Sequence, residues 1–104
     1  MYKSGDVILA QIQFTDTFEI KKRPSVVLFE NYGNFIVAGI TSNLRMEGIM
    51  LTKDEGVIKE SIIKLNYIFT ISNKMIVKKI FSLSVEKKKL LYDELIKHLN
   101  NLIN

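Results

Sequence analysis

The stretch that decides the fold runs from residue 22 to residue 43 and reads KRPSVVLFENYGNFIVAGITSN. It holds two apolar, β-branched runs, Ser25–Glu30 and Phe35–Ser42, which have the composition of strands. Between them, Asn31–Asn34 is rich in residue types that accept a positive φ, as tight turns require. The spacing therefore predicts an antiparallel β-hairpin.

The open end of this hairpin carries a cation and a hydroxyl. Arg23 precedes one strand, where Pro24 favours an extended backbone in the residue before it, and Thr41-Ser42 ends the other strand. Only Arg23 and Arg45 are arginines among the 15 basic residues, and the guanidinium is a charged, planar fork suited to bidentate phosphate contact. We expect a small phosphate-binding pocket here. A solvated charge run at a strand start would give the same sequence.

Composition restricts the possible chemistry. At 104 residues, the chain predicts one domain, residues 1–104, with one core. It has no cysteine and a single histidine, His98, which excludes thiol catalysis and Cys-based metal sites and argues against a Ser-His-Asp mechanism. No signal-peptide pattern and no apolar run of bilayer length is visible, so we expect a cytoplasmic protein.

The net charge of +4 comes from the end of the chain. Residues 1–30 and residues 31–72 each balance four basic with four acidic side chains, whereas residues 73–104 carry seven lysines and three acidic side chains. Such a segment fits a nucleic-acid or acidic-peptide partner. A lysine-rich, solvated helix face would look the same, and the sequence leaves both interpretations open.

The remaining segments predict short strands and loops. Strands are expected at Gly5–Phe14, Gly48–Thr52, Ser61–Ile71 (one bent strand or two) and Val77–Ile80, with a loop at Thr15–Lys22 and a turn at Lys53–Gly56. Many short strands with turn signals and one closing helix predict a mainly β fold, a small and strongly bent β-barrel.

The closing helix is expected to start after Ser84, a residue type that caps helices. Leucines then recur at helical spacing, at Leu91, Leu95, Leu99 and Leu102. We expect this amphipathic helix to bury its four leucines against the sheet or against a second subunit.

These segments together resemble the MazF/PemK-like toxin family. The resemblance covers nearly the whole chain and rests mainly on Gly5-Asp6-Val7-Ile8-Leu9, Lys22-Arg23-Pro24-Ser25-Val26-Val27-Leu28 and Ala38-Gly39-Ile40-Thr41-Ser42-Asn43. It implies an SH3-like β-barrel with a C-terminal amphipathic helix, usually a homodimer, and the toxin role in a type II toxin–antitoxin system. It further implies a metal-independent, sequence-selective endoribonuclease that cuts single-stranded mRNA without a cofactor and is inhibited by a cognate antitoxin with an acidic tail.

The resemblance also implies roles for individual residues. Arg23 and Thr41 correspond to the catalytic pair, which would stabilise charge on the phosphate while a ribose 2′-hydroxyl attacks, leaving a 2′,3′-cyclic phosphate and a 5′-hydroxyl. In one branch of the family, an arginine and an aspartate two residues apart carry acid–base work, and this chain has Lys64 and Asn66 instead. Residues expected to contact RNA are Lys22, Ser42, Asn43, Glu19 and Lys64. Aromatic candidates for stacking unpaired bases are Phe14, Phe18 and Tyr67.

Two other functions remain open at this stage, because fold alone does not determine function. One is a non-catalytic module of the same fold that binds nucleic acid or an acidic peptide. The other is a protein-binding SH3-like adaptor, which would show no salt-sensitive binding of nucleic acid.

Overall fold

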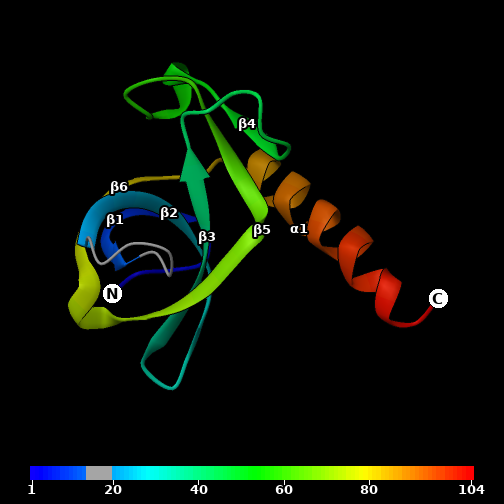
Figure 1. Ribbon diagram of the computed structural model, residues 1–104, viewed down its shortest axis with the longest axis horizontal. Helices are drawn as coiled ribbons and strands as arrows, with labels where there is room; N and C mark the ends of the chain where they lie inside the picture. Colours follow the sequence, from blue (N-terminus) through cyan, green and yellow to red (C-terminus); the bar gives the residue numbers. More distant parts are fainter. Residues whose placement is uncertain (14–19) are drawn as a thin grey trace.

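The computed structural model describes residues 1–13 and 20–104 (Figure 1). Within them lie the strands β1 (Asp6–Gln13), β2 (Ile20–Asn31), β3 (Asn34–Thr41), β4 (Ile49–Leu51), β5 (Ser61–Ser72) and β6 (Ile76–Ser82). The helix α1 (Val85–Leu99) follows, and short 3-10 helices occupy η1 (Lys53–Glu55), η2 (Asn73–Met75) and η3 (Asn100–Leu102). The predicted elements are thus present, with somewhat different bounds.

All the strands belong to one antiparallel sheet in the order β4-β5-β3-β2-β1-β6. The sheet curls strongly on itself, and α1 runs outward from one side of it (Figure 1). The prediction of a mainly β fold, a strongly bent barrel with a C-terminal helix, is confirmed: the six-stranded sheet curls into a half-barrel (Figure 1). Register shifts in three of its five strand pairs accompany this curl, as bulges usually do.

The central hairpin is formed by β2 and β3. Its last pair before the turn is Asn31 with Asn34, so the loop has two residues, Tyr32 and Gly33. Both have a positive φ, 52° and 82°, as the favoured two-residue hairpin turns require. The predicted antiparallel hairpin is therefore correct.

Strand β2 begins earlier than the sequence suggested. The loop was expected to extend to Lys22, but residues 20–22 pair with β1. Pro24 consequently lies inside the strand and not at its head. Proline is accepted there because the pairing with β3 starts only at Ser25, so this half of β2 has a partner on one side.

The core has two clusters, one on each face of the sheet. Val26 and Val27, adjacent on β2, are 0% and 1% exposed and belong to different clusters. Since successive side chains of a strand point to opposite faces, β2 is buried on both sides. One cluster reaches α1 through Leu91.

The helix starts as expected but buries less than expected. The Ser84 hydroxyl accepts a hydrogen bond of 3.1 Å from the amide of Lys87, which caps the helix. Leu91 is buried and Leu95 is half-buried, whereas Leu99 and Leu102, expected to be buried, are 54% and 81% exposed. That prediction is wrong for the single chain, because α1 projects beyond the sheet (Figure 1). No helix in the described ranges is long and apolar enough to cross a membrane.

Candidate functional site

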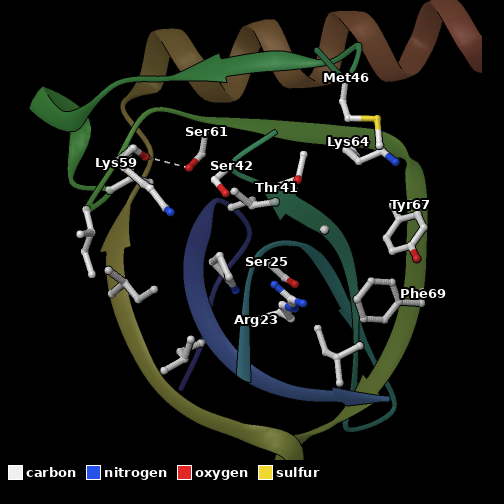
Figure 2. A pocket seen from close by; sticks show the side chains of 18 residues that line it. Arg23, Ser25, Thr41, Ser42, Met46, Lys59, Ser61, Lys64, Tyr67 and Phe69 are labelled. Carbon is white, nitrogen blue, oxygen red and sulfur yellow. Dashed lines mark hydrogen bonds between the residues drawn. The ribbon is translucent and has the colours of Figure 1, made fainter. Parts of the chain in front are cut away.

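A pocket of about 570 Å³ lies at the open end of the β2–β3 hairpin (Figure 2). Its walls come from both hairpin strands, from β1, β5 and β6, and from the loops on either side of β4. The lining residues are Leu9, Ile12, Arg23, Pro24, Ser25, Gly39, Ile40, Thr41, Ser42, Met46, Val57, Ile58, Lys59, Ser61, Lys64, Tyr67, Phe69 and Ile80. The volume is in the range of ligand-binding pockets, about 300–1,000 Å³.

The hairpin register brings Arg23 and Thr41 into this pocket. Ser25 pairs with Gly39 at the end of the β2–β3 ladder. Residues two positions further along each strand lie on the same face, which places Arg23 and Thr41 at the hairpin mouth. Figure 2 shows both side chains in the pocket, with Ser42 beside Thr41.

Local hydrogen bonds orient the Thr41 hydroxyl. The amide of Asn43 donates to Thr41 Oγ1 at 3.1 Å, and Asn43 Oδ1 in turn accepts from the amide of Arg45 at 3.1 Å. A hydroxyl has one donor and two acceptor positions. Since one acceptor position is used by the loop, the O–H of Thr41 can donate to a group in the pocket.

The pocket is positively charged. Arg23, Lys59 and Lys64 line it, and no acidic side chain among the described residues does so. The carbonyl of Lys59 accepts a hydrogen bond from the Ser61 hydroxyl at 2.8 Å, which fixes the loop that carries this lysine (Figure 2). Cations at close range attract anionic groups more strongly where the site is partly shielded from water. The arrangement therefore suits a phosphate.

Two aromatic rings form one side of the pocket (Figure 2). Tyr67 and Phe69 are both on β5 and meet edge to face, with centroids 6.3 Å apart at 84°. The ammonium of Lys64 lies 4.7 Å from the centre of the Tyr67 ring, a cation–π contact. The pocket thus combines cations with aromatic rings, as sites for nucleotides do.

The predicted site residues divide into three groups. The structure brings Arg23, Thr41, Ser42, Lys64 and Tyr67 together in the pocket. It does not bring in Lys22, which alternates to the other side of β2, or Asn43, whose side chain builds the loop. The exposed Asn66 is also outside the lining. Glu19, Phe14 and Phe18 lie outside the described residues.

Sequence reasoning missed several residues of the pocket, notably Ser25, Gly39, Lys59 and Phe69. The first two lie two positions from Arg23 and Thr41, so the period of a strand could have found them. Lys59 lies in the loop before β5, and Phe69 lies on β5 itself. Both reach the pocket because the sheet curls, which no local sequence pattern shows. Across the described ranges, no group of three or more His, Asp and Glu side chains could hold a metal ion.

The fold and the pocket define a class: a curled antiparallel sheet with a cationic site at the mouth of its central hairpin. The family model described as PemK-like, MazF-like toxin of type II toxin–antitoxin system matches residues 3–99. The chain therefore belongs to this family of toxins, as the sequence resemblance predicted, and a toxin of such a system has an antitoxin partner.

A solved structure shows the same fold. The Mycobacterium tuberculosis toxin MazF-mt6 matches with a TM-score of 0.76 over 91% of this chain and 96% of its own, at 20% sequence identity. At this identity, the similarity is one of fold. None of the curated proteins matches the chain in sequence.

Proposed function

We propose that this toxin is a sequence-selective endoribonuclease that cleaves single-stranded mRNA, with Arg23 and Thr41 acting on the scissile phosphodiester. The observation that carries the proposal is their shared pocket, which Lys59 and Lys64 make cationic. An mRNA substrate implies action in the cytoplasm, and cell fractionation that finds the toxin elsewhere would contradict this.

The reaction proposed is an internal transesterification. The ribose 2′-oxygen forms a bond to the adjacent phosphorus while the bond from phosphorus to the 5′-oxygen of the next nucleotide breaks. One proton leaves the 2′-hydroxyl and one is taken up by the departing 5′-oxygen. The products are a 2′,3′-cyclic phosphate and a free 5′-hydroxyl, and the step consumes no other reactant.

The two residues would act where negative charge develops. As the 2′-oxygen approaches phosphorus, charge increases on the two non-bridging oxygens. The guanidinium of Arg23 can donate to them through two N–H groups, and the Thr41 hydroxyl, oriented by the Asn43 amide, supplies another donor. A preorganised donor of this kind lowers the barrier by about 2.7–4 kcal/mol. Since these groups supply the stabilisation, the proposal requires no metal ion.

Arg23→Ala is expected to slow cleavage of a single-stranded RNA by at least about a hundredfold in the presence of EDTA. Arg45→Ala is the matched control, because it removes the chain's other arginine, which does not line the pocket. It should cleave at the rate of the unmodified protein. Rates are followed by gel analysis of a labelled RNA, and the product ends are identified by mass spectrometry.

Other outcomes would point elsewhere. Equal rates for the two arginine variants would remove Arg23 from the reaction. Cleavage lost on adding EDTA and restored by a divalent cation would contradict a metal-independent step. An RNA that is retarded on a gel but remains intact would favour the non-catalytic binding module of the same fold.

The cationic pocket also suggests how the antitoxin would inhibit. We infer that an acidic segment of the antitoxin occupies the space beside Arg23, Lys59 and Lys64, where it would exclude RNA. Lys59→Glu should then weaken the complex of toxin and antitoxin. An affinity unchanged by this reversal of charge would show that the antitoxin binds elsewhere.

A further inference from the structure

The two lysines of the pocket lie on opposite sides of it. Figure 2 shows Lys59 at one wall and Lys64 at the other, with Thr41 and Ser42 between them. A single phosphate bound by Arg23 and Thr41 does not account for these further cations. Cations spaced across one pocket suit a chain of phosphates better than one phosphate, because each cation then faces an opposite charge of its own.

A bulge in β5 brings Lys64 into the pocket. Gly39 of β3 faces the whole stretch between Ile63 and Ile68 of β5, because the register of the two strands shifts there. Bulges of this kind redirect side chains and are common beside active sites. The ammonium of Lys64 lies 4.7 Å from the centre of the Tyr67 ring, and this cation–π contact holds it at its own side of the pocket.

The loop before β5 presents Lys59 at the other side. The Lys59 carbonyl accepts a hydrogen bond from the Ser61 hydroxyl at 2.8 Å. The neighbouring carboxylate of Glu60 accepts from the backbone amide of Lys53 at 3.2 Å. This acidic side chain is therefore used to close the loop, and it does not line the pocket.

The same loop is attached to the rest of the fold. The carboxylate of Glu55 lies 3.4 Å from the ammonium of Lys87 on α1. The ring of Phe81 on β6 packs against Gly56, where an added Cβ would lie 2.6 Å from its Cγ. A cation carried on a fixed loop loses less freedom when it binds an anion than one on an unattached loop does.

Neither pocket lysine is neutralised by a carboxylate within the described residues. Several other lysines are, with ammonium–carboxylate distances of 2.9–3.4 Å. Lys59 and Lys64 form no such pair across residues 1–13 and 20–104. Their charges are therefore available to an anion that enters the pocket.

We propose that Lys59 and Lys64 bind the two phosphates that flank the scissile one, each lysine on a different side of the cut. The inference rests on the proposed endoribonuclease function. It defines the substrate as an RNA chain with a phosphate both before and after the cleaved linkage. The two lysines contribute to the binding of RNA, whereas Arg23 and Thr41 act on the reacting phosphate.

A scan of single uncharged linkages tests these contacts by binding, independently of cleavage. The probe is a short RNA that the toxin cleaves, made with 2′-O-methyl sugars so that it stays intact. One phosphate at a time is replaced by an uncharged methylphosphonate, and affinity is measured by fluorescence anisotropy. If the toxin cleaves no RNA, the probe is a sequence selected from a random pool by binding.

The variants remove a charge but keep most of the side chain: Lys59→Gln and Lys64→Gln. Lys53→Gln is the matched control, because Lys53 is an exposed lysine of η1 that does not line the pocket. In the unmodified protein, an uncharged linkage on either side of the cleaved one should lower affinity about two- to fivefold, as the loss of a partly exposed ion pair does.

Lys59→Gln should lose the response to one flanking linkage, and Lys64→Gln should lose the response to the other. Each of these variants should also reduce the slope of log affinity against log salt by about 0.7, the value of one phosphate contact on a single strand. Their single-turnover rates at saturating RNA should stay close to that of the unmodified protein. Lys53→Gln should match the unmodified protein in every measurement.

Three results would separate the possibilities. If Lys59→Gln or Lys64→Gln keeps both responses, the inference is wrong, even where that variant binds the antitoxin more weakly, and the proposed function stands if RNA is still cleaved. Loss of the response to the same linkage in both variants would contradict their placement on opposite sides of the cut. The expected pattern in a protein that cleaves no RNA would support the phosphate contacts and refute the nuclease.

Discussion

At the scale of single residues, Thr41 shows how a loop can fix the direction of a hydroxyl. Its oxygen accepts a hydrogen bond from the amide of Asn43, two residues further along the chain. The O–H of Thr41 is therefore left to donate to a group in the pocket. The methyl group takes no part in this hydrogen bond. A serine can make the same contact, although it loses the restriction that β-branching places on the side-chain torsion.

Thr41→Val is expected to slow RNA cleavage about a hundred- to a thousandfold, the effect of losing one preorganised donor, with little change in shape. Thr41→Ser should remain much closer to the unmodified protein because the hydroxyl is kept. Thr70→Val, an exposed position on β5 outside the pocket, is the control. Single-turnover rates measure the effect. A rate for Thr41→Val within threefold of the control would show that the hydroxyl does not act.

The position of a single residue could be predicted from the sequence where the pairing of two neighbouring strands alone determines it. Arg23 and Thr41 followed from the hairpin alone, because its turn sets the register. Lys22 and Asn43, also predicted to contact RNA, do not line this pocket: strand alternation places the first on the other face of β2, and the second builds the loop. The burial of Ser25 depends on β1 and β3 packing on both sides of β2, which a linear pattern does not show.

At the scale of elements, the leucine spacing correctly predicted that α1 is a helix with an apolar face. It did not predict how much of that face the sheet would bury. Leucine spacing shows which face of a helix is apolar, but not how far the surface beneath it extends. The contacts of α1 with the core come from Leu91 and the half-buried Leu95. Leu99, Leu102 and Ile103, at the end of α1 and just beyond it, are 54%, 81% and 83% exposed.

We propose that the toxin is a homodimer, as the family resemblance implies, and that a second copy covers these exposed leucines. Leu99→Glu should convert dimers to monomers, because it replaces one of these exposed leucines with a charge that a dimer interface would bury. His98→Glu changes the adjacent exposed position outside the leucine stripe and should leave the dimer intact. Sedimentation over a range of concentrations measures both. If the unmodified protein sediments as a monomer throughout, the proposal is wrong.

At the scale of the whole molecule, Asp6 connects the first strand of the sheet to the last. Its carboxylate accepts from the Lys3 amide at 2.9 Å and from the Ser82 hydroxyl at 2.8 Å, and it lies 3.4 Å from the ammonium of Lys79. These contacts join β1 to β6 at an edge of the sheet. The Gly5-Asp6 pair was recognised in the sequence as a family feature, but its partner Ser82, 76 residues away, depends on sheet order.

The contacts of Asp6 make the stability of the fold depend on pH. Burial raises the pKa of this carboxyl, but the hydrogen bonds from the Lys3 amide and Ser82, together with the charge of Lys79, lower it more, so its pKa lies below the ordinary value. A carboxyl with a lowered pKa in the folded state contributes stability above its unfolded pKa. That contribution is lost as the pH falls below about 4, toward the folded pKa.

Asp6→Asn should therefore lower the free energy of unfolding at pH 7 by about 1.5–3 kcal/mol, the usual value of hydrogen bonds to a charged group. The difference from the unmodified protein should shrink as the pH falls below about 4, because the native carboxylate becomes protonated as the pH approaches its lowered pKa. Asp93→Asn removes an exposed carboxylate paired with Lys89 and should change stability by less than about 1 kcal/mol. Urea unfolding at several pH values measures all three proteins. A difference between Asp6→Asn and the unmodified protein that does not shrink at any acid pH at which the unmodified protein still folds would mean that the charge of Asp6 contributes nothing. The hydrogen bonds alone would then hold this corner of the sheet.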